Sequence, residues 1–436
     1  MLILKSLKDS IGNGKDLNSS NSMEYLLSIK PIPQKENNSN NQFNNSNSNN
    51  NDDNRRLEII SEETEIGESN DIILQRFLSN CSNHSIILND IPNTLDGILM
   101  LGNNNAWSEV FKRFTEQLQN SDQSSINALN ALKLKSTFLL KKFDIYEQLI
   151  TSSLKNLDNN SNNDIKHVFY WQILRIDVYL ASNRTTEAMH IMHSLPVIPD
   201  DKHKDLQEIK LITNFNILIA SKRYKVAIKG LVNEIKSLDD SNFKLILYGH
   251  LIHLLVYTGL LQSAIYYSNQ LQECVCRLNL PESHVISHNS LICQALVLYA
   301  QEEYECAAVL YHLVISGISN SSSSSGSSSN SNNTNTNNSM SIEDVHLSMD
   351  SLLSTAINNF CICCVHLKLI NRCVQMLEQF IQRNPQNALS DTVVFNLCTI
   401  YDLKSSQLLS SKLKKVLYNV AQIYHRSELD FKSFRI

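Results

Sequence analysis

The amino-acid sequence predicts an all-α fold, a solenoid in which helical hairpins stack in series along the chain. Apolar side chains return at helical spacing through most of the 436 residues, and short polar turns divide the predicted helices into pairs. Glycine and proline are scarce, with 10 and 7 residues, which is too few for the turns of a β-sandwich or a barrel. The prolines fall in the N-terminal region, between the predicted helices or at a helix end, where they do not break a helix.

The stretch 211–231 shows the repeating unit. Leu211, Phe215 and Leu218 share one face of a first helix, and Ala227 lies on the facing helix after a short turn. The same order recurs over residues 172–192, 248–268, 291–311 and 357–377. Two weaker units precede these, around 107–114 and 138–149, and a last pair of helices over 392–403 and 408–423 closes the series.

A small residue holds the same place in the second helix of each unit, where it lets two helices approach closely. These residues are Ala188, Ala227, Ala264, Ala307 and Cys373, spaced 39, 37, 43 and 66 apart. The order of apolar helix, turn, bulky residue and small residue resembles the tetratricopeptide repeat, a helix–turn–helix unit of about 34 residues. The resemblance implies a tetratricopeptide-like α-solenoid, which is a right-handed superhelix of helical hairpins.

Composition divides the chain into regions. Residues 1–70 form a low-complexity tail, mostly Asn and Ser over 35–54, which we expect to be disordered because it cannot bury enough apolar surface. Residues 71–425 form the repeat array, interrupted by a Ser/Asn-rich loop over 319–340 that we also expect to be disordered. Residues 426–436 are a C-terminal extension.

Nothing in the sequence predicts catalysis or a cofactor. The motifs HExxH, GxSxG, GxxxxGK[ST] and GxGxxG do not occur in it. Cys361 and Cys364 lie on one helical face, where the repeat needs small core residues, so we interpret them as core and not as zinc ligands. His250 and His253 share a helix face, but no third ligand accompanies them. We therefore expect no catalytic residue, no metal site and no enzyme activity.

Charge and hydropathy favour a soluble, cytosolic protein. The 38 basic and 43 acidic residues leave a net charge of −5, which argues against a nucleic-acid partner. Polar residues interrupt the longest apolar stretch, 251–267, so we expect no direct membrane insertion. The N-terminus lacks the apolar run of a signal peptide, and the ten cysteines show no secreted disulfide framework.

The first helix of each pair is expected to line a concave groove that binds a partner protein. Side chains at these positions are mostly apolar with Asn and His between them, and Lys and Arg are absent, so the face does not suit a carboxylate-tail clamp. It suits an amphipathic helix or another apolar surface of a partner. Packing against the next repeat remains the alternative for each of them. The candidate residues are Ile209, Ile212, Asn216, Ile246, His253, Asn289, Ile292, Leu296, Tyr299 and Asn358.

The C-terminal part of the chain resembles one family more specifically. The residues are INNFCICCVHLKLINRCVQMLEQFIQRNPQ over 357–386 and DTVVFNLCTIYDLKSS over 391–406, with DFKSF at 430–434. This block is similar to the closing part of the family of the twelfth subunit of the TRAPP (transport protein particle) vesicle-tethering complex. The resemblance is specific over about 355–436 and only architectural over 90–318.

The TRAPP resemblance implies a non-catalytic scaffold or adaptor subunit that acts in ER-to-Golgi vesicle transport and in autophagy. It implies a cytoplasmic location, peripheral to the ER–Golgi intermediate compartment and the Golgi. The implied partners are other TRAPP subunits, the eleventh among them, and indirectly a Rab GTPase. Two alternatives stay open: a tetratricopeptide adaptor in another assembly, such as a ubiquitin ligase or a ciliary transport complex, and an enzyme with a site hidden between helices.

Overall fold

The computed structural model describes residues 67–81, 85, 87–92, 94–117, 132–158, 165–196, 204–324 and 348–436. Every regular element in these ranges is a helix, and no strand occurs among them, which confirms the predicted all-α class. The expected tail up to residue 66 lies outside the described residues. So does most of the expected Ser/Asn loop, although helix α16 continues to Ser324, beyond the expected start of that loop.

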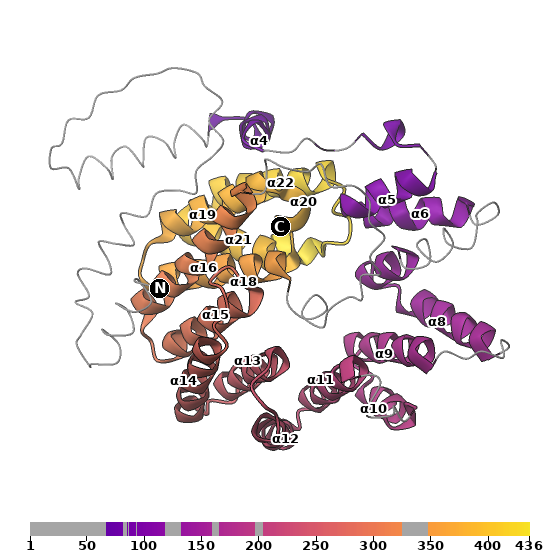
Figure 1. Ribbon diagram of the computed structural model, residues 1–436. Helices are drawn as coiled ribbons and strands as arrows, with labels where there is room; N and C mark the ends of the chain where they lie inside the picture. Colours follow the sequence, from indigo (N-terminus) through magenta and orange to yellow (C-terminus); the bar gives the residue numbers. More distant parts are fainter. Residues whose placement is uncertain are drawn as a thin grey trace. The chain divides into compact units, whose positions relative to one another are not determined.

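Figure 1 shows the helices in chain order. They are α4 (Asn70–Ser79), α5 (Leu95–Asn103), α6 (Trp107–Gln117), a helix over 132–139, α8 (Phe143–Asp158), α9 (Ile165–Ala181), α10 (Thr185–Ser194), α11 (Lys204–Ala220), α12 (Tyr224–Ser237), α13 (Asn242–Tyr257), α14 (Leu261–Arg277), α15 (Val285–Ala300), α16 (Tyr304–Ser324), α18 (Met349–His366), α19 (Ile370–Arg383), α20 (Pro385–Ala388), α21 (Asp391–Lys404) and α22 (Gln407–Ile423). Two short 3-10 helices, η1 (Leu88–Asp90) and η2 (Phe431–Phe434), complete the set.

The first helix of most hairpins ends in the same way, at a residue in the left-handed conformation. At the end of α11, Lys222 has φ 59° and its N–H donates to the carbonyl of Ile219 at 2.9 Å. The N–H of Arg223 donates to the carbonyl of Leu218 at 2.8 Å, which completes a Schellman motif and stops the helix. The equivalent left-handed residues at the other turns are Asn105, Lys141, Asn183, Gly259, Glu302 and Lys368.

These turns fix the spacing of the small residues. Each small residue follows a left-handed residue by five positions, so Ala227 follows Lys222 and Ala264 follows Gly259. All five small residues are fully buried, with 0% of their surface exposed. In the pairs α9–α10, α11–α12 and α13–α14 this place faces the first helix of the same hairpin, because it lies just over one turn into the second helix. The predicted hairpin repeat is thereby confirmed.

The chain forms two compact units. One unit comprises residues 88–303 and 317–353, and its described part holds helices α5 to α15. Helix α13 lies at the centre of its apolar core, with ten buried residues, because α12, α14 and α15 all pack against it. A neighbouring core joins α8, α9, α10 and α11 around Phe169, Ile176 and Tyr179.

The other unit comprises residues 1–87, 304–316 and 354–436. Its described part ends in the hairpin α21–α22, and the early helix α4 packs on α22. Ile73 and Phe77 are buried in α4, and Lys412 Nζ donates to the carbonyl of Glu68 at 2.7 Å. A segment from near the start of the chain thus covers the outer face of the last long helix. The spacing of the apolar residues in α4 does not predict this long-range contact.

The C-terminal extension folds back onto the same hairpin. Asp391, at the start of α21, accepts from the N–H of Asp430 at 2.9 Å and from Ser433 Oγ at 2.8 Å. Phe434 is buried, and its ring meets the ring of Tyr418 edge-on at 5.2 Å. The extension therefore packs on the apolar surface of this hairpin.

Candidate partner-binding face

The first helices of three successive hairpins place a polar side chain at one shared position, four residues before the helix ends. These are Asp177 on α9, Asn216 on α11 and His253 on α13, and all three are exposed. Dehydration by the surrounding protein nevertheless raises the pKa of Asp177 to about 6 and lowers the pKa of His253. Asp177 and His253 therefore reach solvent while the surrounding protein dehydrates them in part.

Four predicted groove residues lie elsewhere, and their assignment to the groove is wrong. Ile209, Ile212, Ile246 and Ile292 keep only 7%, 1%, 2% and 1% of their surface exposed and belong to the core. Helical spacing predicts which residues share a face, but not whether a neighbouring helix covers that face. Here the neighbours cover it, as the packing-against-repeats alternative requires.

The remaining predicted residues reach solvent to different degrees. Asn289, Leu296 and Tyr299 on α15 are half-buried. A Cβ built on Gly249 would lie 2.9 Å from Asn289 Nδ2, so glycine at this place lets α13 and α15 approach closely. Asn358 lies in the other unit, where its Oδ1 accepts from Asn396 Nδ2 at 2.6 Å. The described surface therefore combines Asn216, His253 and the half-buried residues of α15.

Sequence reasoning missed Asp177, although a signal for it exists. Asp177, Asn216 and His253 are 39 and 37 residues apart, the same intervals as those between the small residues. Extending the groove positions back by one repeat would have found this carboxylate. Leu296 continues the series after a further 43 residues, so the residue at this position changes from polar to apolar along the chain.

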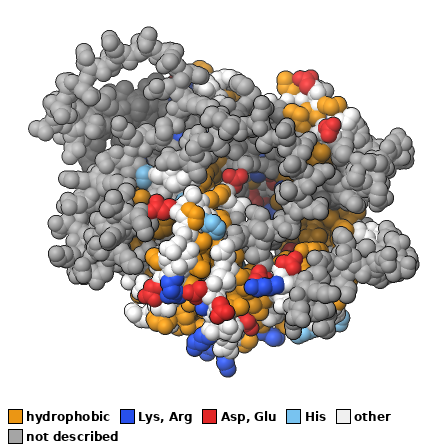
Figure 2. All heavy atoms as spheres, in the orientation of Figure 1, with side chains coloured by type: hydrophobic (Ala, Val, Ile, Leu, Met, Phe, Trp, Pro, Cys, Tyr) orange, Lys and Arg blue, Asp and Glu red, His pale blue; other side chains and the backbone are white. Residues whose placement is uncertain are grey.

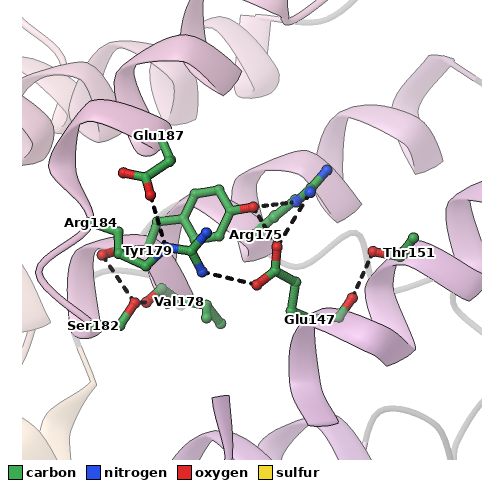
Figure 3. A network of polar contacts seen from close by, with 8 residues as sticks. All are labelled: Glu147, Thr151, Arg175, Val178, Tyr179, Ser182, Arg184 and Glu187. Carbon is green, nitrogen blue, oxygen red and sulfur yellow. Dashed lines mark hydrogen bonds and ion pairs between the residues drawn. The ribbon is translucent and has the colours of Figure 1, made fainter. Parts of the chain in front are cut away.

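A polar network joins three helices at one edge of the same unit (Figure 3). Glu147 on α8 accepts from Tyr179 Oη at 2.6 Å, from Arg184 Nη1 at 3.0 Å and from Arg175 Nη2 at 3.4 Å. These donors hold the pKa of Glu147 below its ordinary value, the hydrogen bond from Tyr179 being the largest cause. Arg184 also donates to Glu187 at 3.0 Å and lies over the ring of Tyr179 at 4.3 Å.

The charges of this network are paired with one another. Each carboxylate accepts from a guanidinium and from a hydroxyl, and these donors hold the pKa values of Glu147 and Glu187 below their ordinary values. The network joins the hairpin containing α8 to the hairpin formed by α9 and α10.

Cysteines fill the core of the hairpin α18–α19. Cys361, Cys364 and Cys373 are buried, and Cys373 Sγ donates to the carbonyl of Cys361 at 3.2 Å. Burial also raises the pKa of Cys361 well above its ordinary value, so its thiol stays protonated. The interpretation of Cys361 and Cys364 as core residues is confirmed. Within the described ranges, no group of three or more His, Cys, Asp or Glu residues is placed to hold a metal ion.

No helix of the described residues is both long and apolar enough to cross a membrane. No family model matches the chain. Two curated proteins do show similarity, the trafficking protein particle complex subunit 12 of Mus musculus and that of Homo sapiens. Each is 35% identical over 66 residues, which is 15% of this chain but only 8% of the mouse protein and 9% of the human protein. The match therefore spans less than a tenth of either relative.

Three solved structures are similar at low identity. The apo form of RapI has a TM-score of 0.38 at 14% identity, covering 67% of this chain and 76% of that one. The Cut9–Hcn1 hetero-tetramer of the APC/C has a TM-score of 0.39 at 12% identity, covering 79% and 55%. The tetratricopeptide-repeat sensor protein PH0952 of Pyrococcus horikoshii has a TM-score of 0.39 at 12% identity, covering 78% and 55%.

The three structural likenesses are too distant to carry an argument about function. The hairpins, their repeated turns and their buried small residues carry the assignment of the fold instead. The chain is a tetratricopeptide-type protein of stacked helical hairpins, similar over a short segment to subunit 12 of the trafficking protein particle complex.

Proposed function

We propose that this chain is a non-catalytic scaffold subunit of a TRAPP-type vesicle-tethering complex, acting in ER-to-Golgi transport and autophagy. The observation that carries the proposal is the 35% identity over 66 residues to subunit 12 of that complex in mouse and human. A stack of hairpins supports a scaffold role, because it presents extended surfaces on which other subunits can bind. The proposed partners are other TRAPP subunits, the eleventh among them, and indirectly a Rab GTPase.

The proposed location follows from the same similarity: cytoplasmic, at the periphery of the ER–Golgi intermediate compartment and the Golgi. The proposed contact face comprises Asn216, His253, Asn289, Leu296 and Tyr299. These side chains reach solvent, and they offer both apolar contacts and amide or imidazole hydrogen bonds to an incoming segment.

Affinity purification of the tagged full chain from its own cells, followed by mass spectrometry, tests the assignment. We expect several TRAPP subunits to be recovered at physiological salt. A control bait carrying Ile212→Asp, which disrupts the core, should recover none of them. Recovery of ubiquitin-ligase or ciliary transport subunits in their place, or of no TRAPP subunit, would contradict the proposal.

The contact face is tested in the same experiment by changing its exposed residues. Asn216→Arg combined with His253→Asp should reduce the recovery of TRAPP subunits while the helical circular dichroism signal stays unchanged. Unchanged recovery would mean that the subunits bind another face of the scaffold.

A further inference from the structure

The turn between α11 and α12 carries a dense group of cations. Lys222, Arg223, Lys225 and Lys229 are all exposed and fall within one turn and the first two turns of α12. Among the described residues, no carboxylate forms an ion pair with any of them, whereas Lys244 and Arg277, elsewhere in the same unit, both pair with Asp240. Figure 2 shows Lys and Arg side chains at the lower margin of the view, where Figure 1 draws α12.

The preceding hairpin shows how this fold neutralises a cation at the same place. Arg184 and Arg223 each follow the left-handed turn residue and each form the N-cap of the second helix, without a side-chain capping bond. Arg184 is paired with two carboxylates, Glu147 and Glu187, as Figure 3 shows.

Both carboxylates are replaced by apolar residues one repeat later. Val226 follows Arg223 by three positions, as Glu187 follows Arg184. Met189 lies six positions after the left-handed residue of its own hairpin, as Glu147 does. The chain therefore keeps the arginine of this edge and removes its internal partners, and Val226 is left 57% exposed.

The positive charges of these residues also destabilise helix α12. The first turn of α12 contains no acidic residue, and positive charge near a helix N-terminus is unfavourable because the unpaired N–H groups there carry partial positive charge. A feature that lowers stability and has no internal partner indicates binding of an external anion.

Apolar side chains adjoin the cations and define the kind of anion. The ring of Tyr224, between Arg223 and Lys225, meets the ring of Tyr257 edge-on at 5.5 Å. Tyr257 is 73% exposed, and Leu260 in the next turn is 48% exposed. A ligand for this edge needs carboxylates for the cations and an apolar side chain for the Tyr257–Leu260 surface.

A protein segment fits this edge better than a membrane surface does. Successive helices alternate in direction, so the turns after α11, α13 and α15 lie along one edge of the unit. The turn after α15 exposes Glu302 and Glu303, whose negative charge would repel anionic lipids that approached the same edge. A short acidic segment can bind the cations without reaching Glu302 and Glu303.

We infer that the edge formed by Lys222, Arg223, Lys225, Val226 and Tyr257 is a docking site for an acidic segment of a partner protein that contains an aromatic or aliphatic anchor. The site lies at the turns between helices, so it is separate from the contact face proposed above. The partner's carboxylates take the places that Glu147 and Glu187 hold around Arg184.

The test uses a fluorescein-labelled peptide of about twelve residues in which Glu and Asp flank one Phe. We expect the full chain to bind it in a fluorescence anisotropy titration, and binding to weaken as salt rises from about 0.05 M to about 0.3 M because exposed charges are screened. Lys222→Glu, Arg223→Glu and Lys225→Glu together should weaken binding about tenfold or more. A peptide with Gln and Asn in place of the acids should not bind.

A second variant separates loss of binding from loss of folding. Met189→Glu with Val226→Glu restores the two internal carboxylates, so it should abolish peptide binding while thermal stability stays equal or rises. Equal binding of the neutral peptide, full binding by the restored variant, or binding of phosphatidylserine vesicles without binding of the acidic peptide would each overturn the inference.

Discussion

The hydroxyl of Tyr179 donates a 2.6 Å hydrogen bond to the carboxylate of Glu147, which lies 32 residues earlier on the preceding hairpin. The same carboxylate also pairs with Arg175 and Arg184. Glu147 is therefore the one side chain of this network that links α8 to both helices of the next hairpin. These charged groups fix the relative orientation of helices whose contact is otherwise apolar.

Tyr179→Phe removes the hydrogen bond to Glu147 and the one that Tyr179 Oη accepts from Arg175 Nε at 3.0 Å, but keeps the ring under Arg184. We expect the free energy of unfolding to fall by about 1–2 kcal/mol, because the lost bond involves an ionised acceptor that is only 26% exposed. Urea denaturation at neutral pH measures the change. Tyr170→Phe, on an exposed ring of the same helix, is the control and should have almost no effect.

Acid weakens the same contact. The pKa of Glu147 is depressed in the folded chain, so its contribution is fully present above the ordinary pKa of 4.5 and is lost as pH falls through the lower folded-state pKa. Glu147→Gln should therefore reduce stability at neutral pH and narrow the difference between the native chain and the variant below about pH 4. Parallel losses at all pH values would show that the carboxylate charge is irrelevant.

Ile212→Asp or Ile292→Asp places a charge in the core. Each side chain is 1% exposed, so an unpaired carboxylate there should cost at least about 3 kcal/mol and unfold part of the helical stack. Circular dichroism against temperature measures this. The control is Asn216→Asp, on the exposed face of the same helix as Ile212, and its melting temperature should stay within a few degrees of that of the native chain. An equal loss of stability in the Ile212 and Asn216 variants would contradict the difference in burial between the two positions.

Ala264→Trp overfills the contact between α13 and α14. Ala264 is fully buried, and the two helices approach closely there, so the ring must force them apart. We expect a loss of more than about 2 kcal/mol and a lower melting temperature. Tyr266→Trp, on the exposed side of α14, should leave the melting temperature unchanged.

Lys222→Gly should stabilise the chain. Lys222 has φ 59°, a conformation that strains a side chain with a Cβ and that glycine adopts freely, so we expect a gain of about 0.5–1 kcal/mol. Lys229→Gly, in the interior of α12, should instead lose about 1 kcal/mol. Chemical denaturation compares the two; loss in both would mean that the turn is not strained.

Much of the fold could be predicted because its pattern is local. The intervals between the small residues follow from a constant hairpin geometry, and the structure reproduces them at the left-handed turns. The turn residues themselves escaped prediction, because Lys222, Glu302 and Lys368 are not typical left-handed residues. The docking of α4 on α22 also escaped prediction, because it joins segments over 300 residues apart.

The candidate site was harder to predict than the fold. Asn216 and His253 reach solvent as expected, but Ile212 and Ile246 do not. A helical period assigns residues to a face, whereas burial depends on the helices that pack on that face. The group of cations around Arg223 could not be predicted as a site for a similar reason. Its significance depends on the comparison with Arg184, and the fold is what brings the carboxylates to Arg184.

A crystal or cryo-electron microscopy structure of the purified full chain tests the serial stacking of the hairpins most directly. We expect left-handed turn residues at Asn183, Lys222 and Gly259, each followed five positions later by a buried alanine in contact with the preceding helix. Strands in these segments, or hairpins in which Ala188, Ala227 and Ala264 face solvent, would contradict the serial stacking.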